Sequence, residues 1–386
     1  MAAGFFSKTL STLLSTAARW VEFGDGTTGP VHGAVILDPS TGLPSVVGYG
    51  SFEEFLAREG ELTTWTNSAG LVTVATGWGN TALATAQGPS LVGKAVYIQE
   101  VTASLSSPGI GQVQISASAD GRFAGYVRQV VMGANGVSIA VRQIVRGFFV
   151  NTSNVLLNVR NNMTAGSVDY YGAVSASGWR ITDDLDFDAP KVVMFVSDST
   201  MNGTGPTKTA TMWPFLFKKR LRELGTRARL CLKSVSGATS ADHEGWRAAG
   251  YHDIARADLI VYVVGINDAG AAVSDSAYVA NVTAFWEWAK KRYPSAKVVV
   301  CGVSPLENNT SETRAAGLRT AVSDYVAGVA DPRLKYINLG SAFDRTVSSN
   351  YAASDTPGAR VHPNDTGHAA IYSTFTAAWE AFGITI

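Results

Sequence analysis

The chain has 386 residues, and its 31 lysines and arginines balance its 31 aspartates and glutamates, so its formal net charge is zero. This balance argues against a nucleic-acid partner, because nonspecific binding to phosphates needs a positive surface. Hydrophobic residues make up 46% of the chain and charged residues 16%, against about a quarter in an average protein, which excludes a mostly disordered chain and indicates a large core.

Residues 1–60 are predicted to form an N-terminal helix followed by a connecting or attachment segment rich in turn formers, such as those of Asp38–Pro44. Five apolar residues near the start recur at alternating spacings of four and three, which places them on one face of a helix. They are Phe6, Leu10, Leu13, Ala17 and Trp20. This face suits either packing within its own domain or docking onto a second copy of the chain, and both interpretations stay open.

The sequence contains no apolar run close to the roughly 20 residues needed to cross a bilayer, so we expect no membrane insertion. The first segment also lacks a positively charged stretch before its apolar residues, and we expect it to be retained and not cleaved as a signal peptide. Cys231 and Cys301 each lie in an apolar run, where we expect small buried thiols and not a disulfide or a metal site.

Residues 61–176 are predicted to form an antiparallel β-sandwich. Runs such as 112–118 alternate apolar with polar side chains, the pattern of half-buried strands. Two dipeptides between these runs favour the tight turns of hairpins. They are Asp120-Gly121 and Asn135-Gly136. The pattern indicates no chemistry in this region.

Residues 177–190 are acidic and end in a proline, and we predict a linker. Asp184, Asp186 and Asp188 alternate along it and raise the question of a calcium site. No glycine turn and closing glutamate follow at the spacing of an EF-hand loop, so a solvated connection is the preferred interpretation.

Residues 191–386 are predicted to form an α/β domain. Five continuous apolar runs are typical of strands buried on both faces, and the stretches between them are long enough for helices. Such alternation predicts a parallel sheet between layers of helices, in which ligands bind beyond the carboxyl ends of the strands. The runs are 192–196, 230–232, 259–264, 298–301 and 336–339.

Four short blocks at these strand ends carry residues suited to acyl transfer. Ser199 follows the first strand, the place of a nucleophile on a sharp turn. Gly237 follows the second strand and offers a backbone N–H, and Asn267 follows the third with an amide that can donate to an oxyanion. His362 lies in the loop that opens the last helix, and its position makes it the best general base.

The other four histidines are weaker candidates for a base. His32 and His252 do not lie at the carboxyl end of a strand. His243 follows the glycine block, and we expect it at an exposed helix start. His368 falls inside the expected last helix, and we interpret it as a structural residue.

The four blocks occur in the order typical of SGNH hydrolases, and residues 190–386 resemble a GDSL-type esterase of that superfamily. The resemblance implies a three-layer, flavodoxin-like α/β/α fold and no metal or organic cofactor. It also implies that Ser199 is the nucleophile and His362 the general base. The N–H of Ser199, the N–H of Gly237 and the side chain of Asn267 would then form the oxyanion hole.

One departure concerns the acid that orients the catalytic histidine. In the family this acid normally lies three residues before the histidine, and here Ala359 occupies that position. Either a backbone carbonyl orients His362, giving a Ser-His dyad, or an acid such as Asp355 reaches it from the same loop. A missing acid would lower the rate without excluding activity, because its role is to fix the tautomer and stabilise the imidazolium.

The string Asp198–Met201 is similar to the first block of rhamnogalacturonan acetylesterase-like members, which implies removal of acetyl groups from a polysaccharide. The turn-rich β region and the terminal esterase together resemble a bacteriophage tail fibre or tailspike. We therefore expect a virion location, or otherwise an extracellular one, with host surface glycan as substrate and other virion proteins as partners. The N-terminal helical face predicts a homo-oligomer, for example a trimer.

Two other interpretations remain. The first is a non-catalytic virion structural or glycan-binding protein with a degenerate hydrolase domain, which the alanine at position 359 favours and the four intact blocks disfavour. The second is a bacterial carbohydrate esterase with an accessory domain, whose expected signal peptide is not evident.

Overall fold

The computed structural model describes residues 186–386 without a break. Before them it describes Tyr49 and the ranges 20–22, 28–30, 51–75, 81–87, 92–106, 111–117, 126–132, 139–150, 154–161 and 167–184. Most of the predicted N-terminal helix, the Asp38–Pro44 string and both hairpin dipeptides lie outside the described residues. Trp20, the last residue of the predicted helical face, instead begins a short strand, β1 (Trp20–Glu22), which pairs with β2 (Thr28–Pro30).

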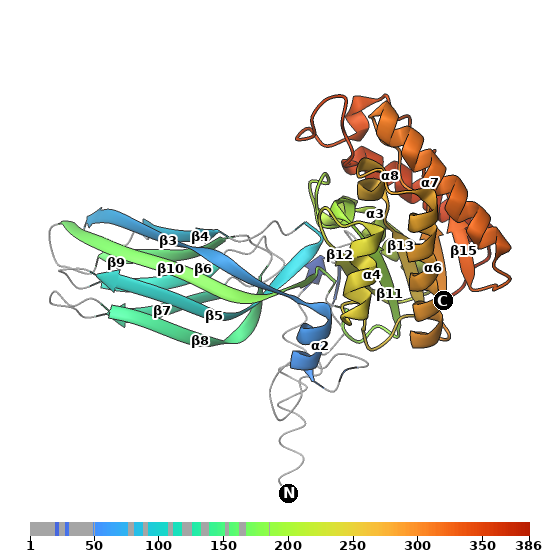
Figure 1. The fold of residues 1–386 in the computed structure, drawn as a ribbon. Helices are drawn as coiled ribbons and strands as arrows, with labels where there is room; N and C mark the ends of the chain where they lie inside the picture. The colour runs from blue at the N-terminus through green and yellow to red at the C-terminus, as the bar shows by residue number, and fades with distance from the viewer. Residues whose placement is uncertain are drawn as a thin grey trace, which may run out of the picture. The chain divides into compact units, whose positions relative to one another are not determined.

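The chain divides into two compact units, one of residues 1–59 with 182–386 and one of residues 60–181. The first unit is built around a parallel five-stranded sheet of order β12-β11-β13-β14-β15 (Figure 1). Its strands are β11 (Lys191–Ser197), β12 (Ala228–Ser234), β13 (Leu259–Val263), β14 (Lys297–Cys301) and β15 (Leu334–Ile337). Ser197 pairs with Ser234 and with Val263, so the segments after β11, β12 and β13 leave the sheet side by side.

Helices cover both faces of this sheet (Figure 1). Met194 and Val196 of β11 face a core that includes Phe285, whereas Phe195 between them makes an edge-to-face contact with Trp213, with ring centroids 5.1 Å apart. The helices are α3 (Trp213–Glu223), α4 (Ser240–Ala248), α5 (Ile266–Gly270), α6 (Asp275–Arg292), α7 (Asn309–Gly328) and α8 (Asp365–Ala381). The predicted three-layer arrangement is therefore present. Among the described residues, no helix is both long and apolar enough to cross a membrane.

Both cysteines of the chain fall on strands of this sheet. Cys231 of β12 and Cys301 of β14 are buried, and neither forms a disulfide. Burial raises the pKa of the Cys231 thiol to about 12, so the thiol is protonated and unreactive at neutral pH. This agrees with the prediction of small core thiols.

A helix that precedes the β region in the sequence belongs to the α/β unit. It is α2 (Phe52–Glu59), whose last residue, Glu59, accepts two hydrogen bonds of 2.5 and 2.7 Å from the guanidinium of Arg229 on β12. Both side chains are 3% exposed. Tyr49 Oη donates to Glu59, and Lys233 Nζ donates to the carbonyl of Arg58. These contacts cover the outer edge of the sheet, where β12 has no further neighbour among the described strands.

The predicted solvated linker over 177–190 is wrong. Strand β10 (Ser167–Thr182) runs through the first part of it, and Asp184 beyond the strand is buried. Thr182 Oγ1 accepts the N–H of Leu232, and Asp184 accepts the N–H of Leu230. The stretch thus supplies acceptors to edge N–H groups of β12, which would otherwise be left unpaired.

The alternating carboxylates that raised the question of calcium pair with side-chain cations instead. Asp184 accepts a hydrogen bond of 2.6 Å from Lys218 on α3. Asp186 and Asp188 both bind the guanidinium of Arg227. These cations lie far from the three aspartates in the sequence. The acidic pattern considered alone therefore resembles an exposed linker.

The second unit, residues 60–181, consists of antiparallel strands in the order β7-β6-β9-β4-β3-β10-β5-β8. Besides β10, they are β3 (Glu61–Ala75), β4 (Thr81–Gln87), β5 (Lys94–Ser106), β6 (Gly111–Ala117), β7 (Tyr126–Met132), β8 (Ile139–Val150) and β9 (Asn154–Asn161). Glu61 pairs with Arg180, so this unit begins and ends on neighbouring strands, as an inserted domain does. Its closure into a two-layer sandwich stays a prediction.

Candidate active site

Ser199 opens a short 3-10 helix, η1 (Ser199–Met201), directly after β11. Asp198 caps this helix, because its Oδ1 accepts the N–H of Thr200 at 3.0 Å and the hydroxyl of Thr200 at 2.9 Å. The carbonyl of Ser199 accepts the N–H groups of Asn202 and Thr204. These bonds hold the turn closed and keep Ser199 at the carboxyl edge of the sheet, where its side chain retains some exposure.

His362 lies between Ser199 and an acid. Its Nε2 is 2.9 Å from Ser199 Oγ, and its Nδ1 is 2.7 Å from Asp355 Oδ1. The second oxygen of Asp355 accepts the N–H groups of Val361 and His362 at 2.9 and 2.8 Å. Partial burial acts to raise the pKa of Asp355, but these hydrogen bonds outweigh it and lower the pKa. An ionised Asp355 places the imidazole proton on Nδ1 and leaves Nε2 free to accept the proton of Ser199.

The histidine loop folds back on itself, and this explains the unusual position of the acid. Tyr351 forms an antiparallel bridge with Pro363, and Ala352 N–H donates to the carbonyl of His362. The residues between are therefore looped out, and Asp355, seven residues before the histidine, meets its ring. Ala359 is exposed and takes no part. Of the two alternatives left open by the sequence, the geometry matches the acid from the same loop.

The glycine and asparagine blocks lie beside the nucleophile. Asn202 Nδ2 donates to Ser236 Oγ, which joins the turn after β11 to the loop after β12. Gly237 in that loop has a φ of +79°, and a Cβ added there would meet nothing within 4 Å, so its backbone borders open space. Within residues 186–386 no group accepts the N–H of Gly237 or of Ser199. Both donors are thus available to a ligand.

Asn267 and its neighbour fix the glycine loop from the other side. Asn267 Nδ2 donates to the carbonyl of Ala238 at 2.9 Å, which uses one of its two amide hydrogens and leaves the second for a ligand. Asp268 accepts hydrogen bonds from the N–H and the hydroxyl of Ser240, at 2.9 and 2.5 Å. Asp268 is not among the site residues predicted from the sequence. Asp268 lies beside Asn267 and is fully buried, and its hydrogen bonds with Ser240 connect α5 to α4.

His243 is not at an exposed helix start, and this prediction is wrong. The helix starts where the sequence indicates, with a capping box between Thr239 and Asp242, but His243 faces inward and is fully buried. Its Nε2 lies 3.0 Å from the carbonyl of Ser197, and its Nδ1 lies 3.1 Å from Nε2 of His252. Burial lowers the pKa of His243 to about 4, so the ring is neutral and donates to Ser197. His243 thus supports the end of β11.

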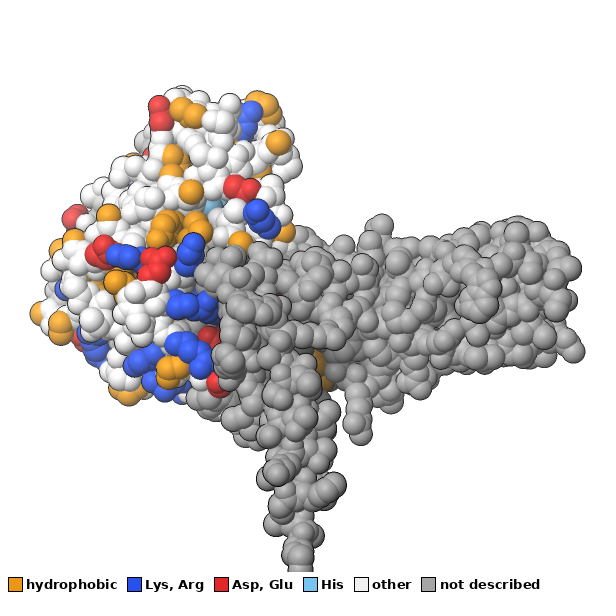
Figure 2. Space-filling model, turned by 180° about the vertical axis from the view of Figure 1, so that it is seen from behind, with side chains coloured by type: hydrophobic (Ala, Val, Ile, Leu, Met, Phe, Trp, Pro, Cys, Tyr) orange, Lys and Arg blue, Asp and Glu red, His pale blue; other side chains and the backbone are white. Residues whose placement is uncertain are grey.

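His362 differs from the other described histidines in the solvent exposure of its side chain. Among the described residues, His243, His252 and His368 are fully buried, whereas the side chain of His362 is 20% exposed. Figure 2 accordingly shows a small patch of histidine surface on the face that it draws. His368 lies in α8, the helix in which the sequence predicts it.

Residues 198–370 match the model of the GDSL-like Lipase/Acylhydrolase family. This range contains Ser199, Gly237, Asn267, Asp355 and His362. No match was found among curated proteins. Similar solved structures include a family two carbohydrate esterase from Cellvibrio japonicus, with 13% identity and a TM-score of 0.41 over 82% of this chain and 98% of that chain. A carbohydrate esterase family 3 from Talaromyces cellulolyticus has 17% identity and a TM-score of 0.42 over 50% of this chain and 100% of that chain.

Proposed function

We propose that the α/β unit hydrolyses carboxylic esters by a Ser-His-Asp mechanism. The observation that carries this proposal is the row of contacts from Ser199 Oγ to His362 Nε2 (2.9 Å) and from His362 Nδ1 to Asp355 Oδ1 (2.7 Å). Nucleophile, base and orienting acid stand in the order that acyl transfer needs. The match of residues 198–370 to an acylhydrolase family supports the same reaction.

The reaction begins when His362 Nε2 takes the proton of Ser199 and Ser199 Oγ attacks the ester carbonyl carbon. The oxyanion that forms accepts hydrogen bonds from the N–H of Ser199, the N–H of Gly237 and the free hydrogen of Asn267 Nδ2. Asp355 stabilises the imidazolium, which gives its proton to the leaving alcohol oxygen. A water molecule, deprotonated by His362, then attacks the acyl-enzyme and releases the carboxylic acid.

We further propose an O-acetyl ester on a polysaccharide as substrate, in a phage tail fibre or tailspike that acts on host surface glycan. The similarity of Asp198–Met201 to rhamnogalacturonan acetylesterase-like sequences supports the acetyl group. The balanced charge of the chain does not oppose a neutral ester. The virion location, the homo-oligomer and the other virion proteins as partners rest on the sequence of the first 180 residues.

Turnover of p-nitrophenyl acetate by the full chain tests the reaction. Ser199→Ala should abolish it, whereas Ser373→Ala on the exposed face of α8, where the hydroxyl only meets the carbonyl of Ala369, should leave it unchanged. Equal turnover by the wild type and Ser199→Ala would refute the proposal and restore the non-catalytic glycan-binding alternative.

Acetate release from a panel of acetylated polysaccharides tests the substrate. Hydrolysis of p-nitrophenyl acetate without release from any polysaccharide would contradict the substrate class and leave ester hydrolysis standing. Light scattering on the full chain tests the assembly, and a clean monomer at micromolar concentration would contradict the predicted oligomer.

A further inference from the structure

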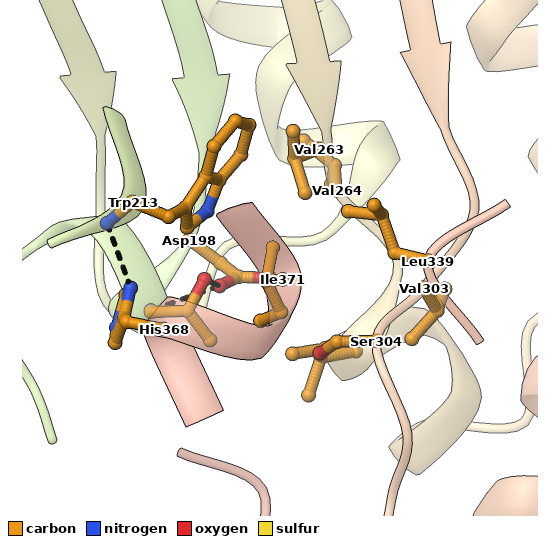
Figure 3. Close-up of a pocket in the computed structure, with 11 residues that line it drawn as sticks. Asp198, Trp213, Val263, Val264, Val303, Ser304, Leu339, His368 and Ile371 are labelled. Carbon is orange, nitrogen blue, oxygen red and sulfur yellow. Dashed lines mark hydrogen bonds between the residues drawn. The ribbon is translucent and has the colours of Figure 1, made fainter. Parts of the chain in front are cut away.

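A small cavity adjoins the nucleophile turn, at the carboxyl ends of β11, β13 and β14 and against α8 (Figure 3). Its volume is about 10 Å³. Apolar side chains such as Val264 and Ile371 form part of the wall. Five side chains with polar atoms also line it. They are Asp198, Thr200, Trp213, Ser304 and His368.

His368 lines this cavity and has an unpartnered donor. Its Nδ1 accepts the backbone N–H of Trp213 at 3.2 Å, so the lone pair of the ring lies on Nδ1 (Figure 3). Burial lowers the pKa of His368 to about 4, which keeps the ring neutral at pH 7 and places its hydrogen on Nε2. His368 is fully buried, and its Nε2 has no hydrogen-bond partner. A buried N–H of this kind is rarely left unpaired in a stable protein.

Asp198 brings an acceptor to the same cavity. Both hydrogen bonds that it accepts, from the N–H and the hydroxyl of Thr200, end on Oδ1. Among the described residues no group donates to Oδ2. Burial raises the pKa of Asp198 to about 6, and the carboxyl is therefore still mainly ionised above neutral pH. An ionised oxygen at this depth needs a donor.

We propose that the cavity holds one water molecule, which accepts a hydrogen bond from His368 Nε2 and donates one to Asp198, and that His368 thereby acts as a positioning residue for the nucleophile turn. A buried water needs about 10–15 Å³ and two to four polar partners, and this cavity provides both. The N–H of His368 disfavours a cation and the carboxylate of Asp198 disfavours an anion. A neutral molecule that both donates and accepts satisfies the two groups together.

The water joins the two segments that carry the reacting groups. Asp198 immediately precedes Ser199, and His368 lies in the first turns of α8, which begins three residues after His362. A fixed bridge between them limits how far the nucleophile and the base can move apart. This effect on catalysis rests on the proposed ester hydrolysis, whereas the presence of the water does not.

A high-resolution crystal structure of the full chain tests the site directly. We expect density for a single water within hydrogen-bond distance of both His368 Nε2 and Asp198 Oδ2. An empty cavity, or a direct hydrogen bond between His368 and Asp198 that closes it, would overturn the proposal.

Matched variants test the positioning role. His368→Asn keeps an acceptor for Trp213 N–H and removes the donor to the cavity. We expect kcat for p-nitrophenyl acetate to fall about tenfold, as for other outer partners of active-site groups, with KM unchanged. Thr376→Val is the control, because Thr376 is also on α8, buried and unpartnered, but does not line the cavity.

Each outcome decides one part of the proposal. An unchanged kcat in His368→Asn, or an equal loss in Thr376→Val, would refute the positioning role. Recovery of most of the lost kcat by His368→Gln, whose longer amide reaches the cavity, would support it. If the wild type does not hydrolyse the ester at all, the proposed function fails, and the density in the cavity still decides the water site.

Discussion

The carbonyl oxygen of Pro363 occupies the space that a side chain at position 205 would need. A Cβ built on Gly205 would lie 2.2 Å from this oxygen, and the φ of Gly205 is +108°, a conformation that L-residues rarely adopt. The backbone of the loop after Ser199 thus packs against the backbone of Pro363, the residue after His362. This contact joins the segments that carry Ser199 and His362.

We therefore expect Gly205→Ala to push the histidine loop away from Ser199. A displacement of about 1 Å at reacting groups costs up to about 100-fold in rate, and we expect kcat for p-nitrophenyl acetate to fall by that order. Gly225→Ala is the control, because Gly225 has a φ of +81° but nothing lies within 4 Å of its would-be Cβ. Equal activity of the two variants would show that the contact with Pro363 does not position the base.

Asp355→Asn tests the identity of the acid. An amide at this position no longer stabilises the imidazolium and favours the wrong tautomer of His362, so we expect kcat to fall about 10³- to 10⁴-fold with little change in KM. Asp344→Asn is a suitable control, because Asp344 is an acid of the same connecting region whose carboxylate accepts hydrogen bonds from Thr346 and not from His362. A loss below tenfold in Asp355→Asn would indicate that His362 works as a dyad with Ser199.

The sequence predicts the parallel sheet and four of the site residues because both depend on local patterns. A buried strand needs a continuous apolar run, and Ser199, Gly237 and Asn267 each follow one directly. The acid is different, since the path of the looped-out segment decides which residue meets the His362 ring, and spacing along the chain does not encode that path. For this reason the sequence alone leaves two alternatives for the group that orients His362, a backbone carbonyl and an acid such as Asp355.

The inward-facing His243 and the linker were mispredicted for a related reason. Polar residues suggest exposure when they are considered alone. His243 is buried because the carbonyl of Ser197 and the ring of His252 satisfy it, and Asp184 is buried because Lys218 neutralises it. These partners lie up to 46 residues away in the sequence. Only the fold brings them together.

The buried histidines predict a loss of stability in mild acid. Burial lowers the pKa values of His243 and His368 to about 4 and that of His252 well below its ordinary value. Between about pH 6.5, where the unfolded chain gains protons, and about pH 4, the unfolded state binds more protons than the native state. Stability therefore falls as the pH falls through this window, by up to about 1.4 kcal/mol per pH unit for each histidine.

Asp198 acts in the opposite direction. Its pKa is raised to about 6, so between about pH 6 and pH 4 its protonation favours the native state and offsets about one of the three histidines. We expect urea unfolding to show constant stability above pH 7 and a clear loss by pH 5. His252→Gln keeps a donor for His243 and removes one titrating group, so the net loss that remains after the offset by Asp198 should be smaller by about half. Equal stability at pH 7 and pH 5 would contradict the prediction.

The pair of Glu59 and Arg229 predicts which part of the chain is needed for the α/β unit to fold. Burial acts to raise the pKa of Glu59, but the guanidinium of Arg229 outweighs it and lowers the pKa, so both groups are charged. Removing one partner of a buried ion pair costs about 3–5 kcal/mol, because the other charge stays buried without compensation. We expect Glu59→Ala to lower the free energy of unfolding by that amount, whereas Glu53→Ala on the exposed side of α2 should change it little.

The same pair defines a sharper experiment on domain organisation. A chain that starts at residue 191 lacks both α2 and the stretch with Thr182 and Asp184, so Arg229 loses its partner and the edge N–H groups of β12 lose their acceptors. We expect this fragment to be insoluble or unfolded by circular dichroism. A chain that keeps residues 49–59 and joins them to 182–386 through a short loop should stay folded and hydrolyse p-nitrophenyl acetate, because Glu59 and Thr182 both anchor on β12. A stable, active fragment of residues 191–386 would show that α2 is dispensable.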